Sequence, residues 1–452
     1  MKKFVSFASE MRVSTLVCSS VAVLLSACGG GNPSDVTPAQ SVQTAGLIAS
    51  GTSLPEQAAA VQSNEPATAG AGDFSLKGYD SEPAAGAATA AATLAPALDG
   101  GTVEAAYAVP ATTYKLYVSP SGNDNNAGTA TAPFRTLARA ARSTRASTTV
   151  FVAPGTYAGS LKTTINGSAS GRIYFVSTTK WGAKIVPSGS TNYAWDNRGS
   201  YVDIVGFHID GTGSVWKNGI YNGGSYGMVR ANWVHHVGKN IGCNSSGGSA
   251  IGVDSYYYGV KTDIVGNLVH DIGLPGCRFI QGIYMSTSGT IKNNVVYRVG
   301  EAAIHLWHDA NNVIITNNTV TTSHTGIIVG GGDFYHRSGP SDYNRVYNNI
   351  VYDNAMGISE QGKTGVHNQY KNNLVYQNPT YNFRLLNGLT ASATVSSAPY
   401  FVSYAKTGTP NLRLSASSPA IGRGTSADAL SSDFLERPRT ATTGFDIGAY
   451  QH

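Results

Sequence analysis

The chain has 452 residues and a formal net charge of +5, with 13% charged and 10% aromatic residues. A modestly basic balance suits an anionic partner but is also common in proteins without one, so charge alone decides little. The four cysteines form no Cys-x-x-Cys motif and no His/Cys spacing typical of zinc, which argues against the common zinc modules. We expect no nucleic-acid partner.

The N-terminus predicts a secretory signal. Two lysines precede an apolar run at residues 13–25, which is too short to span a bilayer. The motif Leu-Ser-Ala-Cys that ends at Cys28 resembles a bacterial lipobox, which implies removal of residues 1–27 and diacylation of the Cys28 thiol. An ordinary signal peptide followed by a chance cysteine is the alternative. By the same resemblance, Gly29 implies an outer-membrane lipoprotein, on either the periplasmic or the cell-surface face.

Residues 28–112 are rich in Ala, Gly, Ser, Thr and Pro and have no periodic apolar pattern. This composition predicts a disordered tether. Residues 1–27 contribute a charge of +2 and the tether contributes −7, which leaves +10 on the rest of the chain. The positive charge is therefore concentrated in the part that we expect to fold.

From residue 113 the sequence predicts a strand, a turn rich in Gly, Asn and Asp, and a helix near 134–142. The runs TVFVAPGTYAG and RIYFVSTT follow as strands. The first of a series of stacked coils exposes strand edges and core, so it needs a cap. We expect the helix to serve as this N-terminal cap.

Residues 201–390 repeat one pattern every 21 to 36 residues. Each copy holds an aliphatic strand that ends in Asn, a variable loop, and a Gly/Ala-Ile pair that begins another strand. The asparagines share one phase: Asn232, Asn267, Asn294, Asn318, Asn349 and Asn373. The large apolar residues share another: Ile220, Ile251, Ile283, Ile304, Ile327, Ile358 and Phe383.

Each copy contains short runs with period-2 alternation and no helical period, so each copy is a coil of strands. One coil cannot bury its own apolar face, but stacked coils bury a continuous column of Ile and Val. The sequence therefore predicts an all-β fold, a right-handed parallel β-helix with seven coils in residues 201–390. We interpret the asparagines as a structural ladder.

The run YVSPSGNDNNAGTATAPFRTLARAA, together with FVAPGTY, resembles the N-terminal module of secreted right-handed β-helix proteins. These include pectate-lyase-like and other polysaccharide lyase families. Residues 391–452, with NLRLSASSPAIGRGT and FDIGAYQ, resemble a segment that closes such proteins, although Glu436 stands where that segment usually has Gly. The resemblance implies a β-helix at 113–390 and a secreted compartment, but a shared fold does not name the substrate.

In the lyases that this chain resembles, the substrate groove crosses the sheet formed by the strands after Gly-Ile. The outward column of that sheet begins one residue after the Ile: Tyr221, Gly252, Tyr284, His305, Ile328, Ser359 and Arg384. A second outward column lies two residues further: Gly223, Asp254, Ser286, Trp307, Gly330 and Gln361. We expect both columns to form the floor of the groove, with neighbours about 4.8 Å apart.

Long loops are expected to wall this floor. Residues 237–249 and 272–281 precede the strand in adjacent coils and contain Cys243 and Cys277, which predicts a disulfide between the loops in an oxidising compartment. Two free thiols are the alternative. Residues 330–343 and 362–367 would form the opposite wall. The substrate-binding candidates are polar or aromatic residues of the floor and walls: Arg278, His308, Arg384, Tyr221, Asp254, Trp307 and Arg337.

Tyr284 and His305 are expected to be neighbours in adjacent coils. Uronate β-elimination needs a base for the C5 proton, a donor to the departing oxygen, and groups that neutralise the carboxylate. A neutral His305 can be the base, Tyr284 the donor, and Arg278 with Arg384 the partners of the carboxylate. The pattern favours a polysaccharide lyase that acts on an anionic, uronic-acid-containing polysaccharide.

Three alternatives stay open: a glycoside hydrolase, a uronate epimerase, or a non-catalytic glycan-binding protein of the surface. A hydrolase needs two carboxylates about 5 to 9.5 Å apart. Glu301 and Asp309 flank the His305 strand and are the candidates. We expect no cofactor, with calcium held by Asp254, Asp271 and Asp309 as the alternative.

The remaining expectations concern assembly and the other histidines. We expect a monomer that meets the membrane through the Cys28 lipid anchor alone. His235 and His270 share a phase outside the groove and are expected to be stacked surface residues. Three other histidines are expected to have no polar side chains directed toward them: His208, His236 and His324.

Overall fold

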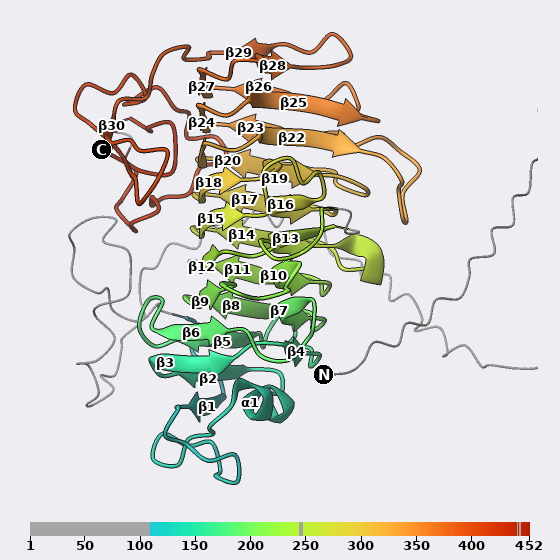
Figure 1. Ribbon diagram of the computed structural model, residues 1–452, viewed down its shortest axis with the longest axis vertical. Coiled ribbons are helices and arrows are strands. Elements are labelled where there is room, and N and C mark those ends of the chain that lie inside the picture. Colours follow the sequence, from blue (N-terminus) through green and yellow to red (C-terminus); the bar gives the residue numbers. More distant parts are fainter. Residues whose placement is uncertain (1–108, 244–246, 441, 443) are drawn as a thin grey trace, which may run out of the picture. The chain divides into compact units, whose positions relative to one another are not determined.

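The computed structural model describes residues 109–452 except 244–246, 441 and 443. In this part of the chain three parallel sheets wind around one core (Figure 1), which confirms the predicted parallel β-helix. The predicted signal peptide, Cys28 and residues 28–108 of the predicted tether lie outside the described residues. No helix within the described residues is long and apolar enough to cross a lipid bilayer.

Each coil contributes one strand to each sheet. Sheet A contains β1 (Tyr114–Val118), β2 (Thr148–Val152), β5 (Ile173–Ser177), β8 (Val202–Val205), β11 (Met228–Arg230), β14 (Thr262–Val265), β17 (Gly289–Lys292), β20 (Val313–Thr316), β23 (Arg345–Tyr347), β26 (Gln369–Lys371) and β29 (Ala391–Ser392). Sheet B contains β3 (Gly155–Ala158), β6 (Ala183–Val186), β9 (His208–Asp210), β12 (Trp233–His235), β15 (Leu268–Ile272), β18 (Val295–Val299), β21 (Thr319–Thr321), β24 (Ile350–Tyr352) and β27 (Leu374–Tyr376). Sheet C contains β4 (Leu161–Thr163), β7 (Tyr193–Asn197), β10 (Asn218–Asn222), β13 (Gly248–Val253), β16 (Ile280–Met285), β19 (Ala302–Leu306), β22 (Thr325–Gly331), β25 (Met356–Gly362) and β28 (Tyr381–Arg384). Outside these sheets lie α1 (Leu137–Ser143), the 3-10 helix η1 (Ser255–Tyr257) and an antiparallel pair, β30 (Phe401–Ser403) and β31 (Asn411–Leu414).

The coils from β8 to β28 are the seven predicted for residues 201–390. Two further coils, β2 to β4 and β5 to β7, precede them. These two coils lack the Asn and Gly-Ile signature, so the repeat did not reveal their register. Strand β29 continues sheet A one strand beyond residue 390, the predicted end of the β-helix.

The predicted asparagine ladder is confirmed. The first five ladder asparagines each donate from Nδ2 to Oδ1 of the next, at distances of 2.9 to 3.1 Å, and all six are fully buried. The residue before each one has a φ between 53° and 62°: Ala231, Gly266, Asn293, Asn317, Asn348 and Asn372. This left-handed conformation makes the tight turn from sheet A to sheet B, and the amide column satisfies its backbone groups.

The predicted apolar column is also confirmed. Strand register aligns Ile220, Ile251, Ile283, Ile304, Ile327, Ile358 and Phe383 in neighbouring coils of sheet C. The isoleucines are fully buried and belong to one core that runs through the coils. Phe383, in the last strand of sheet C, is only partly buried. Burial of this column is the main source of stability that stacking supplies.

Helix α1 lies beside β1 and β4 (Figure 1). The Thr136 hydroxyl accepts a hydrogen bond from the Arg139 N–H at 3.1 Å and so caps the helix N-terminus. Leu137, Ala140 and Ala141 are buried against the first coils. The helix thus sits where the prediction placed it, and its role as a cap stays a prediction.

The C-terminal segment, residues 393–452, packs on the outer face of sheet B (Figure 1). Its residues Leu412, Phe434 and Tyr450 are buried in one cluster with Trp233 and Tyr297 of sheet B. Glu436 has a φ of 61°, a conformation that favours glycine, which gives the usual Gly at this position a physical reason. Here the Glu436 carboxylate instead pairs with Arg230 at 2.9 Å and accepts from the Ser432 hydroxyl at 3.3 Å.

The expectation for the histidines of sheet B is wrong. His235 and His270 do stack, with ring centroids 5.2 Å apart, but they are buried rather than on the surface. His208 has a partner as well, since its Nε2 shares a hydrogen bond with Nε2 of His235 at 2.7 Å. His236 lies 2.5 Å from His235 through the Nδ1 atoms, and His324 pairs with Glu301 at 3.5 Å. Trp233, which is buried together with the C-terminal segment, stacks on His208 at 3.9 Å and donates from Nε1 to His270 at 2.8 Å. A repeat pattern does not encode this cover.

Candidate functional site

Sheet C carries the predicted floor. Strand pairing places the first outward column in register: Tyr221, Gly252, Tyr284, His305, Ile328, Ser359 and Arg384. The column continues backward to Asp196, which pairs with Tyr221, and to Lys162, which pairs with Asp196. Ile328 and Ser359 are buried, at 2% and 0% exposure, so they separate Arg384 from the His305 end of the floor.

Tyr284 and His305 are neighbours in adjacent strands, as predicted. Their ring centroids lie 5.6 Å apart with the planes at 89°, an edge-to-face contact. Part of each residue stays accessible, but Nδ1 of His305 is buried and has no hydrogen-bond partner among the described residues. A buried polar atom of this kind in a native fold calls for an explanation, and a reacting group is one of the few.

Burial sets the protonation state of both rings. Burial, with the nearby His308 as a smaller cause, lowers the pKa of His305 to about 3. Burial also raises the pKa of Tyr284 well above its ordinary value, and the negative charge of Asp254 adds to this effect. Near neutral pH the imidazole is therefore unprotonated and the phenol is protonated.

Asp254 lies at the centre of the polar groups on the floor. Its Oδ1 accepts from the Ser286 hydroxyl at 2.8 Å and from the Tyr256 N–H at 3.0 Å. Burial raises the pKa of Tyr221, and the charge of Asp254 and a hydrogen bond to it raise it further. Asp254 thus faces both Tyr221 and Tyr284 and keeps both phenols protonated.

His308 belongs to the wall next to the floor. Its ring stacks on Tyr335 at 4.0 Å, its Nε2 shares a hydrogen bond with the Tyr335 hydroxyl at 2.7 Å, and its Nδ1 bonds to the Asp333 carbonyl at 2.8 Å. Its ring also meets Tyr284 edge-on at 6.3 Å. The buried Asp309 accepts the backbone N–H groups of residues 335 and 336, which fixes the 330–343 loop against the floor.

Trp307 follows His305 on the second outward column, with ring centroids 5.6 Å apart. A Cβ at Gly330 or Gly362 would lie 2.7 Å from the Trp307 ring, so glycine is required under it at both positions. The indole therefore covers the neighbouring coils beside the pair. It offers a flat surface on which a sugar ring can stack.

The predicted arginines do not converge on the pair. Arg278 is exposed. Burial raises the pKa of Glu301, and the positive charge of Arg278 partly opposes this effect. Arg278 therefore lies near Glu301, at the start of β19. Arg337 lines an open hollow of about 400 Å³ with Asn311, Asn312, Pro340, Asp342 and Tyr343. Arg384 is exposed at the far end of the floor.

The cation that the sequence reasoning missed is Arg198, which follows β7 on the second outward column. Its guanidinium lies 3.6 Å from the ring centroid of Tyr257 and 4.6 Å from that of Tyr221, and it pairs with Asp196 at 2.6 Å. Its Nη1 is buried and donates to no group among the described residues. A Cβ at Gly223 would lie 3.1 Å from this atom, so glycine leaves room for it on the floor.

The carboxylates predicted for calcium do not share one site. Asp271 belongs to β15 of sheet B and pairs with Arg298 at 2.7 Å, whereas Asp254 follows β13 of sheet C. Asp309 lies near Asp254, since its Oδ2 accepts from the Ser255 hydroxyl at 3.0 Å. The two carboxylates of the floor side are thus held by protein donors.

The predicted disulfide between Cys243 and Cys277 is present, with the Cα atoms 4.8 Å apart. It joins the two loops that precede β13 and β16, as the prediction required. Opposite them, exposed tyrosines continue from the floor into the wall, where Tyr256 contacts Tyr335 at 5.5 Å and Tyr258 stacks on His336 at 4.1 Å.

Comparison with known proteins supports the fold. A family model described as a protein of unknown function (DUF1565) matches residues 120–165. An uncharacterized Bacillus subtilis protein, YwoF, is 47% identical over 60 residues, which are 13% of this chain and 13% of that protein. The chain therefore matches about an eighth of the length of this curated relative.

Among solved structures, the pectate lyase Pel9A superposes with a TM-score of 0.50 at 16% identity, over 75% of this chain and 97% of that one. An alginate lyase from Paenibacillus sp. FPU-7 gives a TM-score of 0.38 at 16% identity, over 63% of this chain and 95% of that one. The A-module of a mannuronan C-5 epimerase from Azotobacter vinelandii gives a TM-score of 0.36 at 14% identity, over 54% of this chain and 63% of that one. At these identities the similarity to Pel9A establishes the parallel β-helix fold alone.

Proposed function

We propose that this protein is a polysaccharide lyase that cleaves a uronic-acid-containing polysaccharide by β-elimination on the floor of sheet C. The observation that carries the proposal is the contact between Tyr284 and His305, with ring centroids 5.6 Å apart, in which both groups are neutral near pH 7. A free base and a protonated acid side by side are what elimination requires. A pectate lyase has the same parallel β-helix fold, so this fold is compatible with the proposed reaction.

In the proposed reaction the His305 imidazole removes the C5 proton of a uronate residue. The electron pair of the C5–H bond forms the C4–C5 double bond, and the C4–O glycosidic bond breaks. Tyr284 gives its hydroxyl proton to the departing oxygen, so the step leaves an imidazolium and a phenolate that exchange a proton with solvent. Asp254, which favours the protonated phenol, would help to restore Tyr284.

A histidine with a pKa of about 3 is a weak base in the free protein. A bound uronate carboxylate favours the charged form of a nearby imidazole, so substrate would raise the pKa of His305 and strengthen the base. Arg198, whose buried Nη1 has no partner among the described residues, lies on the same sheet four strands away from His305, so it would meet a different uronate of the polymer. Trp307 and the exposed Tyr256 offer flat faces for sugar rings.

We test the proposal by incubating the protein with a panel of uronate polysaccharides and following the ultraviolet absorbance. Elimination creates a conjugated double bond that absorbs at about 235 nm. His305→Ala and Tyr284→Phe should each lower turnover by about a hundredfold or more, since a positioned acid or base contributes that much. His452→Ala is the control, because His452 is exposed and belongs to the C-terminal segment that packs on sheet B. New reducing ends without absorbance would identify a hydrolase, altered uronate composition without cleavage an epimerase, and binding alone a glycan-binding protein.

The pH profile gives an independent check. The sequence alone suggests that activity rises as His305 loses its proton near pH 6.5. With the pKa of His305 lowered to about 3, that rise in kcat/KM should lie below about pH 5. The profile should stay flat toward alkaline pH until the phenol of Tyr284, whose pKa is raised, loses its proton. A midpoint near 6.5 that disappears in His305→Ala would contradict the burial argument.

For location we propose export and anchoring of a monomer by a lipid on Cys28, with the tether of residues 28–112 between anchor and β-helix. The lipobox resemblance and the two lysines before the apolar run support this. A tether of this composition lets the groove reach a polymer away from the membrane.

A further inference from the structure

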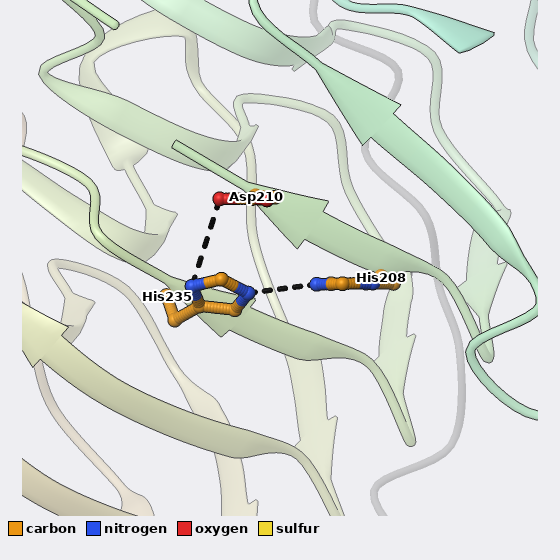
Figure 2. Close-up of side chains that lie close together, drawn as sticks. All are labelled: His208, Asp210 and His235. Atoms are coloured by element: carbon orange, nitrogen blue, oxygen red, sulfur yellow. Dashed lines mark hydrogen bonds and ion pairs between the residues drawn. The ribbon is translucent and has the colours of Figure 1, made fainter. Parts of the chain in front are cut away.

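A second cluster of chemistry-bearing residues lies on sheet B, on a different face of the β-helix from the floor. Figure 2 shows His208, Asp210 and His235, whose ligand atoms all lie within 4.8 Å of one another. His208 and Asp210 lie two residues apart on β9, and His235 on β12 pairs with Asp210 in the next coil. The register of sheet B thus brings the three side chains together.

The two imidazoles meet nitrogen to nitrogen. Nε2 of His208 lies 2.7 Å from Nε2 of His235 (Figure 2). At a metal–nitrogen distance of about 2.0–2.1 Å, two nitrogens that bind one ion at about 90–109° lie about 2.9–3.4 Å apart. A separation of the two rings by a few tenths of an ångström therefore creates a place for an ion between them.

Both rings are held in position by their neighbours. Trp233 stacks on His208 at 3.9 Å with the planes 9° apart, and His270 stacks on His235 at 5.2 Å with the planes 3° apart. These contacts hold the two Nε2 atoms against each other, and an imidazole nitrogen is a common ligand of zinc, copper and nickel.

Asp210 lies on the other side of the His235 ring. Its Oδ1 is 3.7 Å from Nδ1 of His235 (Figure 2), and its Oδ2 pairs with Nζ of Lys184 at 2.7 Å. At 3.7 Å Asp210 does not hydrogen-bond to His235, so its carboxylate acts on the ring through its negative charge. Nδ1 of His236 lies 2.5 Å from the same Nδ1 atom of His235, and the His236 side chain is half-exposed.

We propose that His208 and His235 bind one divalent transition-metal ion through their Nε2 atoms, with the nearby negative charge of Asp210 favouring the cation and water completing the coordination. Nitrogen donors select zinc, nickel or copper over calcium and magnesium, which prefer oxygen. The ion would join β9 to β12, two adjacent coils, and so would stabilise this part of the β-helix. The site lies on sheet B and takes no part in the reaction proposed for sheet C.

Isothermal titration of the chelator-treated, tag-free full chain with Zn²⁺ tests this site. We expect one equivalent to bind and no binding of Ca²⁺ or Mg²⁺. His208→Gln and His235→Gln should each weaken binding at least about tenfold, and Asp210→Asn, which removes only a nearby negative charge, should weaken it less. His324→Ala is the control, because its partly exposed side chain pairs with Glu301 outside the cluster and should leave the affinity unchanged.

A second readout separates metal binding from folding. Zn²⁺ should raise the melting temperature of the wild-type chain and leave that of His208→Gln unchanged, while both proteins give the same circular dichroism in chelator. Bound Cu²⁺ should show nitrogen hyperfine structure in its electron paramagnetic resonance spectrum, and this should be lost in His235→Gln. Absence of saturable binding, or equal affinity in both glutamine variants and the wild type, would overturn the proposal and leave the pair as a hydrogen bond.

Discussion

Replacement of Asn318 by alanine tests the asparagine ladder at its middle. The Asn318 Oδ1 accepts from the backbone N–H and from Nδ2 of Asn294, both at 2.9 Å. Its Nδ2 donates to the Ile291 carbonyl at 2.8 Å, to Oδ1 of Asn349 at 2.9 Å and to the Thr316 carbonyl at 3.2 Å. Alanine removes all five bonds at a position with 0% exposure.

The expected loss of stability depends on which hydrogen bonds the former partners of Asn318 retain. Nδ2 of Asn294 still reaches the Ile264 carbonyl, and Oδ1 of Asn349 still accepts the backbone N–H of residue 318. The backbone N–H of Asn294 loses its side-chain acceptor inside the protein, which costs about 1–3 kcal/mol, and each of the other lost bonds costs about 0.5–1.5 kcal/mol. We therefore expect Asn318→Ala to lower the free energy of unfolding by about 3–9 kcal/mol.

Urea unfolding followed by circular dichroism and tryptophan fluorescence measures this loss. Asn318→Asp discriminates between mechanisms, because it keeps the shape but cannot donate to Oδ1 of Asn349 and so should cost at least as much as alanine. Asn125→Ala, at an exposed position, is the control and should stay within about 0.5 kcal/mol of the wild type. A loss below about 1 kcal/mol for Asn318→Ala, or a milder effect of aspartate, would refute the reasoning.

Three further predictions concern the core, the buried histidines and the anchor. Ile304→Ala at 0% exposure should cost about 2–5 kcal/mol in the same urea assay, and an effect below about 1 kcal/mol would contradict a close-packed column. His208 and His235 have pKa values of about 3 and 2 when folded, against about 6.5 when unfolded, so the unfolded chain binds more protons in acid. Stability should therefore fall as pH drops below about 6.5 and keep falling toward about 3, and a flat urea midpoint from pH 8 to pH 4 would argue against neutral burial. Cys28→Ala should abolish acylation and move the protein from the membrane to the soluble fraction, which metabolic lipid labelling checks, and a label that persists in the variant would count against the lipobox.

The coils were predictable because the signals that specify them are local. An Asn in a fixed phase and an Ile one strand later recur within each copy, and period-2 alternation then fixes which residues share a face. The contact of Tyr284 with His305 follows from that register alone. Arg198 was missed because the coil from β5 to β7 lacks the signature, so nothing in the sequence indicated that residues 196 and 198 continue the two floor columns.

Burial, in contrast, depends on contacts between distant parts of the chain. The cluster that covers sheet B joins Trp233 and Tyr297 to Phe434 and Tyr450, which lie more than a hundred residues later in the sequence. The pattern of β12 shows which side chains point outward, but whether water or another segment meets them is decided by the fold of residues 393–452. For that reason the sequence placed His235 on a sheet correctly and its environment wrongly.

Contacts that the sequence pattern does not encode also distinguish His305 of sheet C from the histidines of sheet B in function. His305 and His208 lie on outward columns of different sheets, and burial lowers the pKa of both to about 3. Their partners differ, however: Nδ1 of His305 is buried with no partner among the described residues, whereas Nε2 of His208 meets a second imidazole at 2.7 Å. A neutral nitrogen without a partner beside a protonated phenol is suited to move a proton, and two neutral nitrogens that face each other are suited to share an ion. The chemistry of each site is thus decided by what the fold places against a nitrogen atom.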